Sequence, residues 1–144
     1  MTRLLILAIT LVGILMAAPS SAGERTLGQW EVHYNALRST FIRPEIAAQY
    51  NLQRSRYQAL VNIAVLDATQ PGKPALNANL TGYALNGIGN RLQLEFTTVR
   101  EGDAIYYLAQ VPYTNQETLH FVIDISVAGV TQQLKFSQQL YTDA

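Results

Sequence analysis

From Gly23 onward, apolar and polar side chains alternate along short runs that are rich in Tyr, Val, Ile and Thr. Successive side chains of a β-strand point to opposite faces, so a period of two predicts strands with one buried and one solvated face. The chain is therefore predicted to be all-β. Seven runs follow this pattern, at residues 27–36, 58–67, 76–85, 91–100, 104–112, 117–127 and 130–141.

Short segments of turn-forming residues separate these runs, for example at 70–73, 86–90 and 101–103. About seven strands at this spacing favour an immunoglobulin-like antiparallel β-sandwich. The Cys-Trp-Cys pattern of antibody domains is absent, because the chain holds no cysteine. Short links leave the strand order open, and a small antiparallel barrel is the alternative architecture.

Residues 37–56, called the insertion below, interrupt the alternation after the first run. Pro44 followed by Glu45 predicts a short helix, since proline suits a first helical turn and an acidic residue suits the helix dipole. Long ordered loops often carry binding residues, and we predict a binding surface here, with a merely solvated loop as the alternative. The insertion also gathers four basic side chains, those of Arg38, Arg43, Arg54 and Arg56.

Residues 1–22 have the pattern of a cleavable signal peptide. Arg3 precedes an apolar run at residues 4–18, which as a helix spans roughly 22 Å and is shorter than the ~30 Å hydrocarbon core of a bilayer. Small residues at 20–22 predict cleavage after Ala22, leaving a single β-sandwich domain of residues 23–144 in the periplasm. A membrane anchor formed by residues 4–18 is the alternative.

The charge of the predicted mature chain excludes some partners. Arg3 is one of ten basic residues, so nine remain against ten acidic residues, and the net charge is about −1. We therefore expect no nucleic-acid partner and no membrane association after signal cleavage. Without disulfides the domain depends on its apolar core, for which Trp30, Phe121 and Phe136 are the main candidates.

Two histidines, His33 and His120, are the first candidates for a metal site. They lie on the polar sides of the first and sixth runs, which usually belong to different sheets of a sandwich. The predicted mature chain also lacks the Cys and Met ligands that copper carriers use. We predict no metal and no cofactor, and we keep His33 as a candidate surface contact.

A catalytic site would have to use His33 with Ser39 or Thr40 as the nucleophile and Asp103 at one end of the sandwich. The hydroxyls of Ser39 and Thr40 more readily form hydrogen bonds with backbone groups where the first strand ends. The pair Glu101 and Asp103 flanks Gly102, which is typical of a tight hairpin rather than of an acid/base pair. We predict no catalytic residues.

The tyrosines suggest a further surface. Tyr107 is predicted to lie in the core, whereas Tyr106 lies on the opposite face of the same strand. Together with Tyr113 and Tyr141, Tyr106 either forms an exposed aromatic strip for a peptide or glycan or covers the rim of the sandwich.

Four stretches of the sequence carry a family resemblance. They are residues 30–36 (Trp-Glu-Val-His-Tyr-Asn-Ala), 39–41 (Ser-Thr-Phe), 100–108 (Arg-Glu-Gly-Asp-Ala-Ile-Tyr-Tyr-Leu) and 134–136 (Leu-Lys-Phe), with Tyr141 near the end. With the signal peptide, this pattern resembles domain-of-unknown-function family 4426, small exported proteins of Gram-negative bacteria. The resemblance implies a periplasmic β-sandwich, and it supplies no activity, substrate or catalytic residue.

The function predicted from the sequence is a periplasmic, non-enzymatic binding or accessory module for an envelope protein, peptide or glycan. The alternatives are a small periplasmic enzyme that uses a His/Ser/Asp-type site and a structural protein that pairs through an exposed edge strand. The sequence makes no prediction of the oligomeric state.

Overall fold

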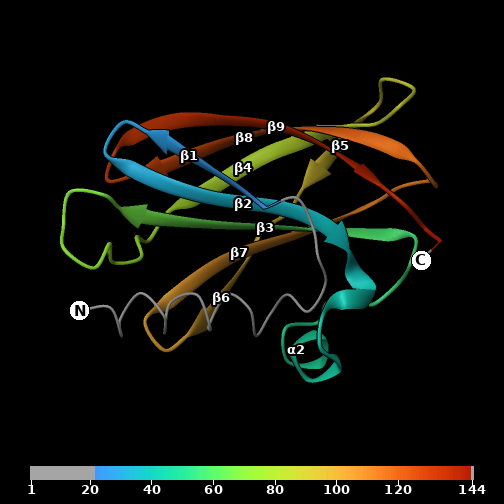
Figure 1. Ribbon diagram of the computed structural model, residues 1–144, viewed down its shortest axis with the longest axis horizontal. Coiled ribbons are helices and arrows are strands. Elements are labelled where there is room, and N and C mark those ends of the chain that lie inside the picture. Colours follow the sequence, from blue (N-terminus) through green and yellow to red (C-terminus); the bar gives the residue numbers. More distant parts are fainter. Residues whose placement is uncertain (1–21, 144) are drawn as a thin grey trace.

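Nine β-strands form two antiparallel sheets in the computed structural model, which describes residues 22–143 (Figure 1). The predicted signal peptide lies outside the described residues apart from Ala22. The first sheet has the order β1-β2-β3-β7-β6, formed by Gly23–Leu27, Trp30–Arg38, Gln58–Asp67, Ala104–Pro112 and Thr97–Glu101. The second sheet has the order β5-β4-β8-β9, formed by Arg91–Leu94, Asn79–Leu85, Glu117–Val127 and Val130–Leu140.

The strand order is that of an immunoglobulin-like sandwich. The strands β2-β3-β7-β6 correspond to the A-B-E-D sheet of that architecture, and β4-β8-β9 correspond to its C-F-G sheet. The edge strand β5 extends the second sheet, and β1 extends the first. The predicted all-β antiparallel sandwich is confirmed, and the strands form two separate sheets instead of one closed sheet.

Two of the predicted strands are in fact pairs of strands, so the described residues contain nine strands rather than seven. The predicted strand 27–36 includes the turn between β1 and β2, where Gly28 has a φ of 60° and Leu27 pairs with Trp30. The predicted strand 91–100 breaks between β5 and β6, which belong to different sheets. The alternation of Leu92, Leu94 and Phe96 ends at this break, since the next buried residue, Val99, is three positions on and packs on the outer face of the first sheet.

The predicted strand 76–85 begins three residues late, at Asn79. The preceding residues form only an isolated bridge to β3, Ala75 with Leu66, and they also bind the Tyr107 side chain. The Tyr107 hydroxyl donates to the Leu76 carbonyl at 2.9 Å and accepts from the Ala78 amide at 2.8 Å. Tyr107 is buried, as predicted, and its hydroxyl fixes the path of the chain into β4.

The inner faces of the two sheets form the main core. Phe121 is 1% exposed and stacks on Phe136 with ring centroids 4.7 Å apart. Trp30 is buried as well, whereas Phe136 is only partly buried and continues the stack outward to Tyr34, with centroids 4.5 Å apart. Aromatic contacts of this kind add to the stabilisation that the buried area supplies.

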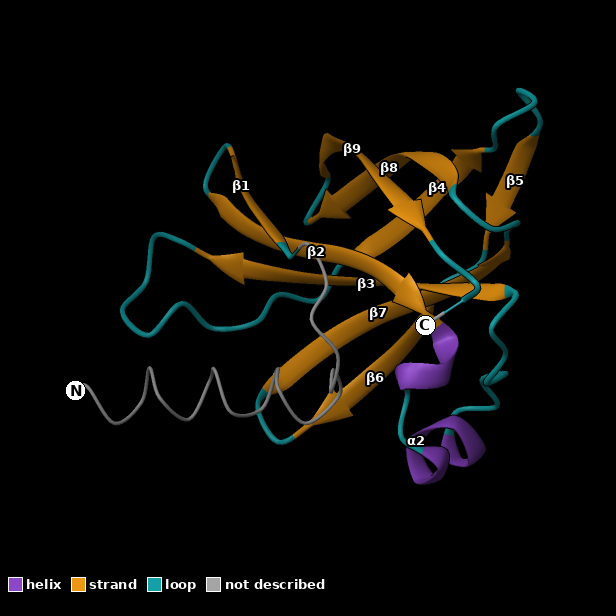
Figure 2. Ribbon diagram, turned by 45° about the vertical axis from the view of Figure 1, so that its right-hand side comes forward, coloured by secondary structure: helices purple, strands orange, loops and turns teal. Residues whose placement is uncertain are grey.

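The insertion covers the outer face of the first sheet at one end. It contains a 3₁₀ turn, Ser39–Phe41, and the predicted short helix, α2 (Pro44–Gln49), both of which follow the end of β2 (Figure 2). These elements bury Ile42 and Ala47 against the sheet. The central strands β3 and β7 are therefore buried on both faces. The sheet residues of this second apolar cluster are Leu37, Leu60, Val99, Tyr106 and Leu108.

We predict that Phe121→Ala lowers the free energy of unfolding by about 3–5 kcal/mol, because it leaves a large cavity between the sheets. That is a large share of the ~5–15 kcal/mol typical of a domain. Thermal unfolding measures the effect, with Ile88→Ala as the control because Ile88 is 82% exposed. Equal melting temperatures for the two variants would contradict this description of the core.

Candidate functional site

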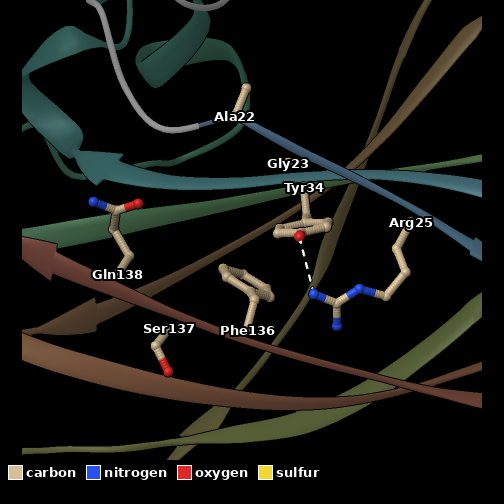
Figure 3. A pocket seen from close by; sticks show the side chains of 7 residues that line it. All are labelled: Ala22, Gly23, Arg25, Tyr34, Phe136, Ser137 and Gln138. Atoms are coloured by element: carbon tan, nitrogen blue, oxygen red, sulfur yellow. Dashed lines mark hydrogen bonds between the residues drawn. The ribbon is translucent and has the colours of Figure 1, made fainter.

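The sandwich opens along the seam between β1 of the first sheet and β9 of the second. A cavity of about 290 Å³ lies there, and we call it the seam cavity (Figure 3). It is lined by Ala22, Gly23, Arg25, Tyr34, Phe136, Ser137 and Gln138.

The pairing of β1 with β2 places the upper wall of the cavity. Gly23 lies opposite Tyr34 and Arg25 lies opposite Val32, so Gly23 and Arg25 share the face of β1 that points toward the sandwich interior. Gly23 lies directly against the Tyr34 ring, since a Cβ atom at this position would come within 2.2 Å of the tyrosine Cζ. Glycine thus permits β1 to lie this close to the ring.

The floor is the outer end of the aromatic stack. Tyr34 from β2 and Phe136 from β9 contact each other here, and both rings are labelled in Figure 3. Beyond them, Gln138 and Ser137 bring polar groups to the rim. The cavity therefore has an aromatic wall and a polar edge.

Arg25 joins the two sheets at this point. One of its terminal nitrogens, Nη1, donates to the backbone carbonyl of Lys135 on β9, and the other, Nη2, donates to the Tyr34 hydroxyl at 3.2 Å. Its guanidinium carbon lies 5.4 Å from the centroid of the Tyr34 ring. The ion pairs of residues 22–143 do not include Arg25, so its positive charge has no carboxylate partner there.

Sequence reasoning missed this site. Arg25 and Lys135 are 110 positions apart, and only the packing of the two sheets brings them together. Phe136 was expected in the core and instead lies where the core reaches the surface. No residue pattern in either strand distinguishes these side chains from ordinary edge-strand residues.

Two of the four arginines predicted for a binding surface donate hydrogen bonds to backbone carbonyls. Arg54 donates from Nε to the Ile42 carbonyl at 2.7 Å and from Nη2 to the Thr40 carbonyl at 2.9 Å. Arg38 donates to the Thr142 carbonyl at 2.9 Å. These guanidinium groups fasten the insertion and the C-terminal segment to the sandwich.

The other two arginines have carboxylates beside them. Arg43 lies 3.6 Å from Glu45, and Arg56 lies 3.8 Å from Asp143, in pairs whose side chains are half exposed or more. The four arginines therefore do not form one uncompensated positive patch. The clustering of these arginines in the sequence did not indicate which partner each guanidinium has.

We predict that Arg54→Ala lowers the free energy of unfolding by about 1–2 kcal/mol, because two carbonyls lose a charged donor. Arg43→Ala in the same insertion is the control and should change it by less than about 0.5 kcal/mol, since exposed ion pairs contribute little. Urea unfolding of both variants measures the difference. Equal unfolding midpoints would show that the Arg54 contacts do not stabilise the insertion.

Of the two alternatives for the tyrosines, the exposed strip does not form, and the candidate surface contact Tyr106 is buried. Tyr106 is 2% exposed because it belongs to the apolar cluster beneath the insertion, and its burial, with the charge of Glu101, raises its pKa to about 12. Tyr113 is also buried and donates its hydroxyl to the Tyr141 carbonyl at 2.9 Å, and burial raises the pKa of Tyr113. Tyr141 remains 49% exposed.

His33 belongs to an ion-pair network on the outer face of the first sheet. Its Nε2 lies 2.8 Å from Oε1 of Glu31 and 3.5 Å from Oε1 of Glu24, which the β1–β2 register places opposite His33. Lys73 donates from Nζ to the other oxygen of Glu31 at 2.5 Å. Chiefly through this hydrogen bond, and also through His33, the network holds the pKa of Glu31 below its ordinary value.

One imidazole and two carboxylates can serve as metal ligands, and these three groups lie within 4.8 Å of one another. Lys73 competes for the carboxylate of Glu31, so the arrangement is already satisfied as an ion-pair network. His120 lies in the other sheet, on β8, with Nδ1 2.6 Å from the Ser137 hydroxyl. The two histidines are therefore separated, as predicted.

The folded-state pKa of Glu31 is lowered, so its ionised form contributes stability above the unfolded pKa of about 4.5, and this contribution is lost as the pH falls through the folded pKa. We predict that Glu31→Gln costs up to about 1 kcal/mol near pH 7 and less near pH 3. Urea unfolding at both pH values measures this. A cost that is independent of pH would contradict the network.

The residues of the enzyme alternative do not converge. Ser39 is fully buried, and its hydroxyl donates to the Ser55 carbonyl at 2.8 Å and accepts from the Ser55 amide at 2.9 Å. His33 precedes Ser39 by six residues along extended chain, a separation of roughly 20 Å. Asp103 lies in the turn between β6 and β7, where Gly102 has a φ of 58°, as the hairpin interpretation expects.

The fold and the seam cavity define a small immunoglobulin-like β-sandwich with a cationic, aromatic opening at its edge. In residues 22–143, no helix has the length and apolar character needed to cross a membrane. The family model named Domain of unknown function (DUF4426) matches residues 24–143, and the chain therefore belongs to this family. The resemblance seen in the sequence is confirmed.

The structure is similar to the crystal structure of a DUF4426 family protein from Pseudomonas aeruginosa PAO1. The two sequences are 34% identical, with a TM-score of 0.76, and the match covers 85% of this chain and 97% of the other. No curated protein matches the sequence.

Proposed function

We propose that the protein is a periplasmic, non-enzymatic module that binds an envelope protein, peptide or glycan, and that the partner occupies the seam cavity. The observation that carries this proposal is the uncompensated guanidinium of Arg25 beside the open aromatic wall of Tyr34 and Phe136. A partner that covers this wall gains apolar contact and a charged hydrogen-bond donor in one place.

Two further observations support the binding class over an enzyme. His33 and Ser39 have separate sets of partners and lie far apart along the chain, so they supply no nucleophile with an adjacent base. The cavity itself is lined by groups that bind, namely a cation, two aromatic rings and an amide.

Export is supported by the sequence of residues 1–22, with its single early basic residue, its apolar run and its small residues before Gly23. The absence of cysteine means that the domain needs no oxidative folding there.

The choice of the seam over the insertion follows from the contacts of the arginines. Arg38 and Arg54 donate to backbone carbonyls and do not line the cavity. Arg25 also donates to one carbonyl, that of Lys135, but its exposed guanidinium lines the cavity and has N–H groups beyond the two that its described contacts use. Unused N–H donors beside a cavity are better placed to meet a partner than guanidinium groups that do not line it.

We predict that Arg25→Ala abolishes most co-purification of the partner with the tagged protein from the periplasm, and more so at low salt. Arg91→Ala is the matched control, since Arg91 is also exposed and lies 4.1 Å above the Tyr83 ring without lining the cavity. Circular dichroism checks that both variants are folded.

Equal partner recovery with wild type and folded Arg25→Ala would remove the seam cavity as the binding site. Mass spectrometry of the same preparation tests the location, because export predicts a chain that begins at Gly23. An unprocessed chain found in the inner membrane would contradict a periplasmic module.

A further inference from the structure

We propose that signal cleavage completes a carboxylate-binding site in the seam cavity, with the new α-ammonium of Gly23 and the guanidinium of Arg25 as its two cations. This inference rests on the proposed function and names the chemical class of the ligand: a carboxylate attached to a flat apolar group.

The first support is the position of the predicted cleavage. Ala22 is both the last residue before the scissile bond and a wall of the cavity. Its removal widens the opening and leaves the amino group of Gly23 at the wall. Ala22 is exposed, so its loss removes no part of the buried core.

The second support is that Gly23 is held in place. It is half buried, it pairs with Tyr34 in the β1–β2 register, and it lies against the Tyr34 ring so closely that no side chain fits between them. The terminal ammonium is therefore presented on an ordered strand.

The third support is the charge on this face of β1. Gly23 and Arg25 are two positions apart on a strand, so they point to the same side, with Cα atoms separated by roughly 6–7 Å. Glu24 between them points to the opposite side, where it lies beside His33. None of the residues that line the cavity is acidic, so two positive charges face it with no counter-ion among them.

The fourth support concerns the rest of the ligand. The Tyr34 hydroxyl accepts from Arg25 and retains its own proton, which it can donate to a carboxylate oxygen. The rings of Tyr34 and Phe136 form an apolar surface next to the cations. A carboxylate on a flat apolar group therefore matches the charges and the wall together, and it can belong either to a free small acid or to the C-terminus of a peptide.

The test uses protein purified from the periplasm, with its first residue determined by mass spectrometry. Benzoate and its uncharged analogue benzamide probe the small-acid source, and a short peptide that ends in phenylalanine, as free acid and as amide, probes the peptide source. Binding is measured by calorimetry and by the chemical shifts of the β1 and β9 amides in NMR spectra.

We expect at least one of the two acids to bind, and its uncharged analogue to bind about tenfold more weakly or not at all. Arg25→Gln should weaken binding of the acid about tenfold, whereas the control Arg91→Gln should leave this binding unchanged. A protein that retains Ala22, made by changing the cleavage site, keeps the folded residues intact and should bind the acid several-fold more weakly because its ammonium is displaced.

The inference is overturned if neither acid binds, if acid and uncharged analogue bind equally, or if the protein that retains Ala22 binds as tightly as the mature chain. The last outcome would remove Gly23 from the site even if Arg25→Gln weakens binding. Each of these outcomes leaves the proposed function to be decided separately, because partner recovery with Arg25→Ala does not depend on the probes.

Discussion

Apolar packing between the inner faces of the two sheets is the interaction on which the rest of the structure depends. The chain has no cysteine, so no covalent link holds one sheet against the other. The stack that runs from Phe121 through Phe136 to Tyr34 extends this packing to the edge of the sandwich. Arg25 adds a polar contact across the same edge when it donates to the Lys135 carbonyl. The candidate site therefore lies where the core itself reaches solvent.

The insertion has a structural role that was not predicted from its sequence, since it covers part of the first sheet. It buries a second set of apolar side chains on the outer face of the first sheet, including Ile42 and Ala47. Arg54 satisfies two of its carbonyls, which keeps a long loop in one conformation. Because the basic side chains of this segment donate to backbone carbonyls or lie beside carboxylates, it offers a partner less free charge than its composition suggests.

The seam cavity, unlike the insertion, has a positive charge available to a partner. Its single cation lies on the short edge strand β1 and has no carboxylate partner in the described part of the chain. A glycine at the start of the strand permits close approach to Tyr34, and the approach shapes the wall. The features that suit this place to a ligand are a strand pairing, a ring contact and an open edge, and none of them is a sequence motif.

The fold class, the turn at Gly102, the short helix at Pro44 and the burial of Phe121 could all be predicted from the sequence, because each depends on local conformational preference or on the period of two. The sequence did not show that residues 91–100 divide between two sheets, since the strand that each half pairs with lies elsewhere in the sequence. The partners of each arginine, and whether a carboxylate is among them, were set by the tertiary structure. That outcome depends on contacts between residues as distant as Arg25 and Lys135, and sequence spacing carries no information about such contacts.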